Sequence, residues 1–201
     1  MNALERFVSA TRALFDREAD PEKRWTSLDP ILADLLSDPA VLEASKAWPE
    51  CHVVDNRVDN LLFYEDPDYK FVVNGLIFGE SDNGAASRIH DHGHIYTLYG
   101  LLAGHQRIQR YERLDDRSQP DRAEIRKTLD SACGPGEIDL VRPYEIHSED
   151  TMGERAVALI IRSELSGGFM QGRYKPESNG YWQGLGPRQT RLPFFGTATE
   201  A

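Results

Sequence analysis

The sequence has few cysteines, no long apolar run and no excess of positive charge. Two cysteines, Cys51 and Cys133, cannot supply the disulfide framework of a small secreted scaffold. The longest apolar runs, 98–103 and 156–161, are too short to span a bilayer, and no apolar leader opens the chain. With 23 basic and 33 acidic residues, the net charge of −10 disfavours nucleic acid and anionic membrane surfaces as partners. We therefore expect a cytoplasmic protein that binds neither.

Residues 1–50 predict helices. Phe7, Leu14 and neighbouring apolar residues recur at helical spacing. Asp29 and Asp38 each precede a proline, which is typical of an N-cap residue followed by proline at the first helical position. We expect this segment to pack as a helical layer on a neighbouring core.

Residues 51–201 predict a mainly β unit, because short apolar runs alternate with turns rich in Gly, Pro, Asn and Asp. Many short strands with close turn signals are typical of an antiparallel barrel or sandwich. The polar segment 115–128 is expected to be a surface excursion, and the aromatic-rich residues after 167 are expected to wrap the barrel. The expected strands are 53–58, 61–64, 71–78, 88–90, 95–102, 107–113, 138–141 and 155–162.

Three of the six histidines fall within five residues: His90, His92 and His94. On a β-strand, residues i and i+2 point to the same face, so His90 and His92 can direct two imidazoles to one point. His94 extends the row if the strand continues, whereas Gly93 allows a bend instead. His147 is the candidate for a third ligand from elsewhere in the fold. Imidazole nitrogens are common ligands of divalent metals, so the pattern predicts a metal site at His90, His92 and His147.

The spacing around these histidines resembles the first motif of the cupin superfamily, G-x5-H-x-H-x3/4-E-x6-G. Its glycine and histidine positions are occupied by Gly84, His90, His92 and Gly104. Thr97 stands where that motif has glutamate. A looser second motif spans 136–147, and the resemblance covers roughly 53–165. It implies a cupin-like double-stranded β-helix, an antiparallel barrel with the metal inside.

A three-histidine site without a carboxylate resembles that of the thiol dioxygenases, which act on cysteine or 3-mercaptopropionate. The string 90–93, His-Asp-His-Gly, also resembles uncharacterised bacterial metal-dependent double-stranded β-helix proteins. The resemblance to the thiol dioxygenases implies Fe(II) as the metal, and zinc, manganese and nickel stay open as alternatives. Three neutral imidazoles leave positions on an octahedral ion for both a substrate thiolate and O₂.

One strand departs from the thiol dioxygenase pattern. That branch's serine, histidine and tyrosine positions are occupied here by Ala158, Ile160 and Arg162. The alignment places the Arg162 side chain on the strand face that points into the barrel interior, where an unpaired arginine is costly to bury. Two interpretations stay open: Arg162 anchors an acidic group of the substrate, or it pairs with an acidic side chain of the protein. The acidic candidates are Glu80, Glu145 and Asp139.

Further candidates surround the histidines. Tyr96 and Tyr99 line the pocket or pack in the core, and His94 faces the substrate or lies at the surface. Arg88 has the parity of the ligands and is a candidate for the pocket mouth. Asp91 alternates with the ligands, so we expect it to face away from them and to serve the structure.

Three functions follow as hypotheses. The first is a three-histidine non-heme iron dioxygenase that uses O₂ and acts on a small thiol or another small chelating acid. The second is a lyase or isomerase that uses a divalent metal as a Lewis acid, with Tyr96, Tyr99, Tyr144 or a glutamate as base. The third is a non-catalytic protein that binds a small ligand. Cupins often dimerise through barrel strands, so the resemblance also implies a homodimer.

Overall fold

The computed structural model describes residues 1–54, 57–79 and 89–196. Gly84 of the first motif, the candidate Arg88 and the acidic candidate Glu80 lie outside the described residues. Within the described chain, four helices precede twelve strands. The helices are α1 Ala3–Arg17, α2 Pro21–Thr26, α3 Asp29–Ser37 and α4 Pro39–Ser45. A short 3₁₀ turn, Pro176–Ser178, lies between two of the later strands.

The helices begin at polar caps that the sequence encodes. Asn2 accepts from the Glu5 N–H at 2.9 Å, and the Glu5 carboxylate accepts from the Asn2 N–H at 2.8 Å. Asp38 caps α4 as expected, accepting from Ala40 N at 2.9 Å. The prediction that Asp29 is a cap is wrong by one residue. Leu28 occupies the N-cap without a side-chain bond, because the chain is already helical there after α2.

The strands form two facing sheets and a hairpin. Their bounds are β1 Val53–Val54, β2 Arg57–Glu65, β3 Val72–Phe78, β4 Thr97–Ala103, β5 Gln106–Arg113, β6 Ile125–Cys133, β7 Ile138–Val141, β8 Ile146–Thr151, β9 Ala156–Arg162, β10 Met170–Lys175, β11 Gly180–Leu185 and β12 Arg188–Arg191. The large sheet has the order β1-β2-β3-β9-β4-β7, with β12 also paired to β2. The small sheet has the order β6-β5-β8, and β10 pairs with β11. All pairings between described strands are antiparallel except β12 with β2.

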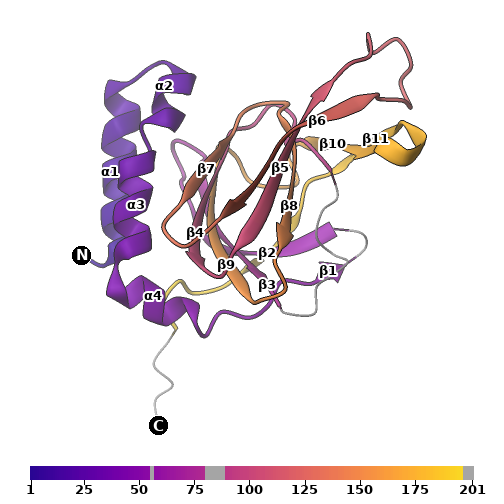
Figure 1. The fold of residues 1–201 in the computed structure, drawn as a ribbon. Helices are drawn as coiled ribbons and strands as arrows, with labels where there is room; N and C mark the ends of the chain where they lie inside the picture. The colour runs from indigo at the N-terminus through magenta and orange to yellow at the C-terminus, as the bar shows by residue number, and fades with distance from the viewer. Residues whose placement is uncertain (55–56, 80–88, 197–201) are drawn as a thin grey trace.

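The small sheet and the β10–β11 hairpin are linked at His90. His90 forms isolated antiparallel bridges with His147 of β8 and with Arg173 of β10. The segment that carries the first histidines therefore runs between β8 and β10, opposite the large sheet. The mainly β prediction is confirmed, with the N-terminal helices lying along one side of the barrel (Figure 1).

The helical layer shares its core with the large sheet. Helix α3 contacts β4 and β7, and the apolar faces of the helices join the buried strand residues in one hydrophobic cluster. Trp48, which follows α4, packs against Phe63 of β2 and Phe194 near the C-terminus. No described helix has both the length and the apolar character needed to cross a membrane.

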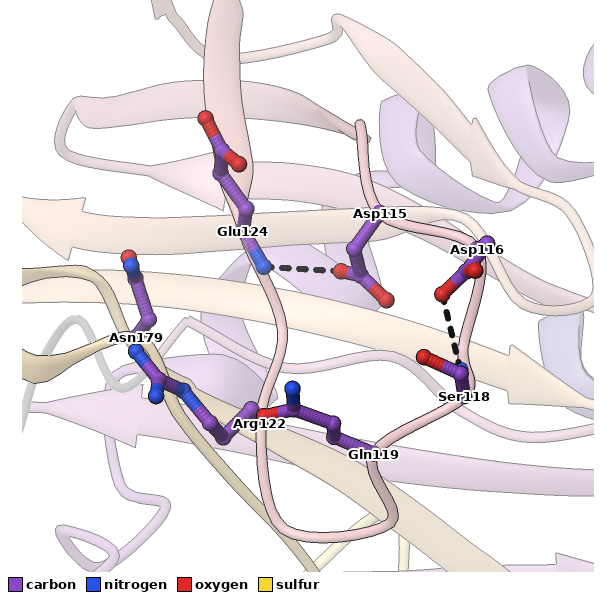
Figure 2. A pocket seen from close by; sticks show the side chains of 7 residues that line it. All are labelled: Asp115, Asp116, Ser118, Gln119, Arg122, Glu124 and Asn179. Atoms are coloured by element: carbon purple, nitrogen blue, oxygen red, sulfur yellow. Dashed lines mark hydrogen bonds between the residues drawn. The ribbon is translucent and has the colours of Figure 1, made fainter.

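The polar segment 115–128 is only partly the surface excursion that the sequence predicts. Strand β6 already begins at Ile125, and the loop before it packs against the β10–β11 hairpin through Ala123 N–H to Asn179 O at 2.9 Å. A cavity of about 270 Å³ lies between this loop and Asn179, and Figure 2 shows the side chains that line it. Its carboxylates shape the loop: Asp115 accepts from the Glu124 N–H at 2.7 Å and Asp116 from the Ser118 N–H at 3.0 Å.

Candidate metal centre

The structure brings the three predicted histidines together between the two sheets. The backbones of His90 and His147 exchange two hydrogen bonds of 2.9 Å, so the two side chains share one face of the small sheet. His92 lies two residues further on, and its Nε2 is 3.1 Å from Nε2 of His90. One ligand atom from each of the three lies within 4.8 Å of the others. His92 and His147 are each 1% exposed, and His90 is half-buried.

The backbone around the first two histidines is held from outside the cluster. Asp91 faces away, as expected, and its Oδ1 accepts from the N–H groups of Gly93 at 2.8 Å and Gly172 at 2.9 Å. Its Oδ2 accepts from the Tyr174 hydroxyl at 2.7 Å. Gly93 has a φ of +59°, so the chain turns there and does not continue as a strand. That turn ends the row of histidines after His92.

The tautomer of His147 is set by a backbone carbonyl. Its Nδ1–H donates to the Glu145 oxygen at 3.3 Å, which leaves a lone pair on Nε2. This Nε2 is buried and has no hydrogen-bond partner among the described residues. A carbonyl that holds one ring nitrogen while the other points inward is the usual support of a metal-binding imidazole. The donor set therefore fits a divalent transition metal.

Burial favours the neutral form of two of the three histidines. It lowers the pKa of His92 and of His147 well below the usual value, and the neighbouring histidines lower both further. Neutral imidazole is the form that binds a metal.

Tyr99 is the predicted tyrosine that reaches the cluster. Its hydroxyl lies 3.3 Å from His92 Nε2 and donates to Glu149 Oε1 at 3.1 Å. Burial, and then the Glu149 charge, raise the pKa of Tyr99 well above its usual value. Glu149 itself was not among the sequence candidates. Its signal is the i, i+2 spacing from His147 on β8, the same spacing that joins His90 to His92.

Arg162 lies in the barrel interior, as its parity predicts. It is 2% exposed, and its Nη1 donates to Asn74 Oδ1 at 2.9 Å. Its Nε has no hydrogen-bond partner within the described chain, and it interacts electrostatically with Tyr99 and Glu149. Burial lowers the pKa of this guanidinium, although an arginine stays charged in proteins.

The proposed protein partners of Arg162 are engaged elsewhere. Asp139 and Glu145 both form ion pairs with Arg110. The interpretation of Arg162 as an ion-pair partner of these two residues is therefore wrong, and Glu80 lies outside the described residues. No other described carboxylate forms an ion pair with Arg162.

Two candidate residues are not brought to the cluster. The His94 side chain is 57% exposed and pairs with Glu164 at 3.2 Å, beyond the turn at Gly93. Tyr96 stacks on Trp25 of α2, with ring centroids 5.7 Å apart, and its hydroxyl donates to Glu22 at 3.2 Å. Positions three apart on an extended chain face opposite ways. Tyr96 therefore packs against the helical layer, whereas the Tyr99 side chain points into the barrel interior.

Comparison with known proteins gives matches of structure alone. No protein-family model matches the sequence, and no curated protein does. The cupin domain of Cnp3 from Schizosaccharomyces pombe is 12% identical at a TM-score of 0.38, over 51% of this chain and 57% of that chain. The chain thus spans less than two thirds of that yeast protein chain.

Two bacterial structures match more of their own length. An uncharacterised conserved Klebsiella pneumoniae protein with a double-stranded β-helix domain is 14% identical at a TM-score of 0.40, over 74% of this chain and 89% of that one. TT1209 from Thermus thermophilus is 12% identical at a TM-score of 0.39, over 55% of this chain and 87% of that one. The fold is a cupin-like double-stranded β-helix. The strand order and the bridges of the chain itself form this barrel.

Proposed function

We propose that the protein is a metal-dependent enzyme for a small chelating acid, and that its first candidate reaction is the Fe(II)-dependent dioxygenation of a small thiol. The observation that carries the proposal is the convergence of His90, His92 and His147 in the same barrel interior as Arg162. Three imidazole ligands suit Fe(II), zinc, manganese or nickel. Bound Fe(II) would supply open coordination positions and one-electron chemistry with dioxygen.

The charges of the interior favour an anionic substrate. The interior holds the positive charge of Arg162 and the negative charge of Glu149, which act on each other, and a bound divalent metal would make the sum positive. A guanidinium forms paired hydrogen bonds with a planar carboxylate, which its unpartnered Nε is able to join. A small acid that carries a second donor, such as a thiolate, matches this combination of a metal and an arginine.

The residues of the chain orient the substrate and exclude water. In the candidate reaction RS⁻ and O₂ give RSO₂⁻, so both oxygen atoms join sulfur. Sulfur loses the four electrons that dioxygen gains, and no further reductant is needed. Arg162 would hold the substrate carboxylate, and the Tyr99 hydroxyl, which donates its proton to Glu149, would present its oxygen as an acceptor beside the reacting group. Since both side chains are buried, these interactions act in a medium of low dielectric.

A second candidate is an O₂-independent lyase or isomerase, and one observation favours it. The Tyr99 hydroxyl lies between a histidine nitrogen at 3.3 Å and the Glu149 carboxylate at 3.1 Å. A phenol in contact with a carboxylate is able to pass a proton to or from a substrate, with Glu149 as the acceptor. Here the metal would act as a Lewis acid.

The test separates the two reactions by their need for oxygen. Protein loaded anaerobically with Fe(II) is screened with small carboxylated thiols and chelating acids, and O₂ uptake is compared with product formed. Dioxygenation predicts one O₂ per sulfinate and no turnover without air. Turnover of a chelating acid under argon, with zinc or Fe(II), supports the lyase or isomerase instead.

Arg162→Met tests how the substrate is held. We expect kcat/KM to fall about 100-fold, because a buried charged hydrogen bond to the substrate is worth roughly 3 kcal/mol. The matched control is Arg107→Met, which removes an exposed arginine paired with Asp130. Metal-loaded protein that turns over none of these compounds under either atmosphere would overturn the proposed enzyme.

A further inference from the structure

A buried carboxylate oxygen of the small sheet points at the histidine cluster. Glu149 Oε2 lies 3.4 Å from Nε2 of His147, and both residues belong to β8. The Glu149 side chain is 10% exposed. Neither of the two facing atoms has a hydrogen-bond partner among the described residues.

The two facing atoms are both hydrogen-bond acceptors, which is unusual for a contact in a buried site. His147 donates its Nδ1–H to the Glu145 carbonyl, so its Nε2 presents a lone pair. The Glu149 carboxylate also presents lone pairs, and two acceptors that face each other in a buried site repel each other. A cation between them removes this repulsion. Neighbouring ligand atoms on one metal ion lie roughly 3.0 to 3.4 Å apart, since metal–ligand bonds are about 2.0–2.2 Å long.

The second oxygen of Glu149 is held in place. Oε1 accepts the Tyr99 hydroxyl at 3.1 Å, which fixes the carboxylate with Oε2 toward His147. Carboxylates that bind metals are commonly oriented by such hydrogen bonds. Strand β4 offers only a threonine, Thr97, at the motif position of the expected carboxylate. Strand β8 offers Glu149 instead.

We propose that Glu149 binds the same metal ion as His90, His92 and His147, through Oε2, with Tyr99 positioning it through Oε1. This inference rests on the proposed metal site. The metal would then have three histidine ligands and one carboxylate ligand. The net charge of the metal and its ligands would be one unit less positive than with three histidines alone. An octahedral ion held in this way keeps two open positions, which is enough for one donor atom of the substrate and one co-substrate while Arg162 holds the substrate carboxylate.

The experiment is a titration of the metal-free full chain with Co²⁺, followed by calorimetry and by visible absorption. Glu149→Gln keeps an acceptor for Tyr99 and removes the charge. We expect its dissociation constant for Co²⁺ to rise at least tenfold, with a changed ligand-field spectrum. Asp150→Asn is the matched control. Asp150 is the next residue on β8, and its charge acts on the surface residue Arg107. We therefore expect the Co²⁺ affinity and the spectrum of this variant to equal those of the wild type.

A second variant tests whether Glu149→Gln weakens Co²⁺ binding only indirectly. The amide introduced by Glu149→Gln is able to donate to His147 Nε2 and thereby compete with the metal, whereas Glu149→Ala leaves this nitrogen free. The proposal requires weaker Co²⁺ binding in both variants. It also predicts that metal-free Glu149→Gln melts at or above the wild-type temperature, because the facing lone pairs are gone.

Each adverse outcome has a distinct meaning. If Glu149→Ala binds Co²⁺ within threefold of the wild type and with the same spectrum, Glu149 is not a ligand and the proposal is overturned. If metal-free Glu149→Gln melts lower and its Co²⁺ affinity is unchanged, Glu149 pairs with a charged His147 instead. If the wild type binds no Co²⁺, the metal site of the proposed function fails, and the inference fails with it.

Discussion

The Asp91 carboxylate fixes the backbone around His90 and His92 by hydrogen bonds. Replacing Asp91 should therefore lower both the stability of the fold and the affinity for metal. The carboxylate accepts three buried hydrogen bonds, from the N–H groups of Gly93 and Gly172 and from the Tyr174 hydroxyl. It is itself 4% exposed. Asp91→Ala leaves these three donors without their acceptor.

The magnitude follows from those donors. A buried donor that loses its partner costs about 1–3 kcal/mol. Relaxation and water entry recover part of this, so we expect Asp91→Ala to lower the free energy of unfolding by about 3–5 kcal/mol. For a chain of this size that corresponds to a fall of about 10 °C in melting temperature. Asp91→Asn keeps one oxygen for the two N–H groups and should cost only about 1 kcal/mol.

Two assays check this expectation. Urea unfolding of metal-free protein measures the loss of stability, and Co²⁺ titration measures whether His90 and His92 remain placed. We expect the Co²⁺ affinity to fall about 10- to 100-fold in Asp91→Ala, as for outer residues that orient metal ligands. Tyr174→Phe removes one of the three bonds and serves as an intermediate case. An Asp91→Ala protein within 1 kcal/mol of the wild type, with unchanged affinity, would refute the reasoning.

Three further predictions concern separate parts of the molecule. Gly172→Ala brings a Cβ into the Asp91 carboxylate and should cost about 1–3 kcal/mol in urea unfolding, whereas Gly196→Ala, whose Cβ would meet nothing within 4 Å, should cost almost nothing. Tyr96→Phe keeps the stacking on the helical layer and should leave Co²⁺ affinity within twofold of the wild type; a tenfold loss would place Tyr96 at the metal after all. Burial and nearby carboxylates raise the pKa of Cys133 to about 11, so its alkylation, followed by mass spectrometry, should rise about tenfold per pH unit from pH 8 to 10, and a plateau below pH 9 would contradict this.

Strong periodic signals made part of the fold predictable. The helices follow from apolar residues at helical spacing and from caps such as Asp38, and β7 occurs at the expected 138–141. The polar strand β6 was not predicted beyond the surface excursion, because almost all of its side chains are exposed and it carries no apolar alternation. Strand β8 was missed for a related reason: the sequence from 146 to 151 is mostly polar, and its burial comes from the barrel around it.

The same contrast holds for the candidate site. The i, i+2 rule predicted that His90 and His92 converge, and their Nε2 atoms lie 3.1 Å apart. Applied to His147, the rule also leads to Glu149, but only once 146–151 is known to be a strand. The opposite roles of Tyr96 and Tyr99 follow from their spacing of three, which places them on opposite faces when the chain is extended.

The central claim is that His90, His92 and His147 hold a metal, and metal content tests it most directly. Tag-free protein purified without oxygen is analysed beside His92→Ala, with the exposed His94→Ala as the matched control. The account predicts about one equivalent of metal in the wild type and in His94→Ala, and almost none in His92→Ala. Folded wild-type protein that takes up no metal even after Fe(II) is supplied, or a His92→Ala variant that retains its metal, would contradict it.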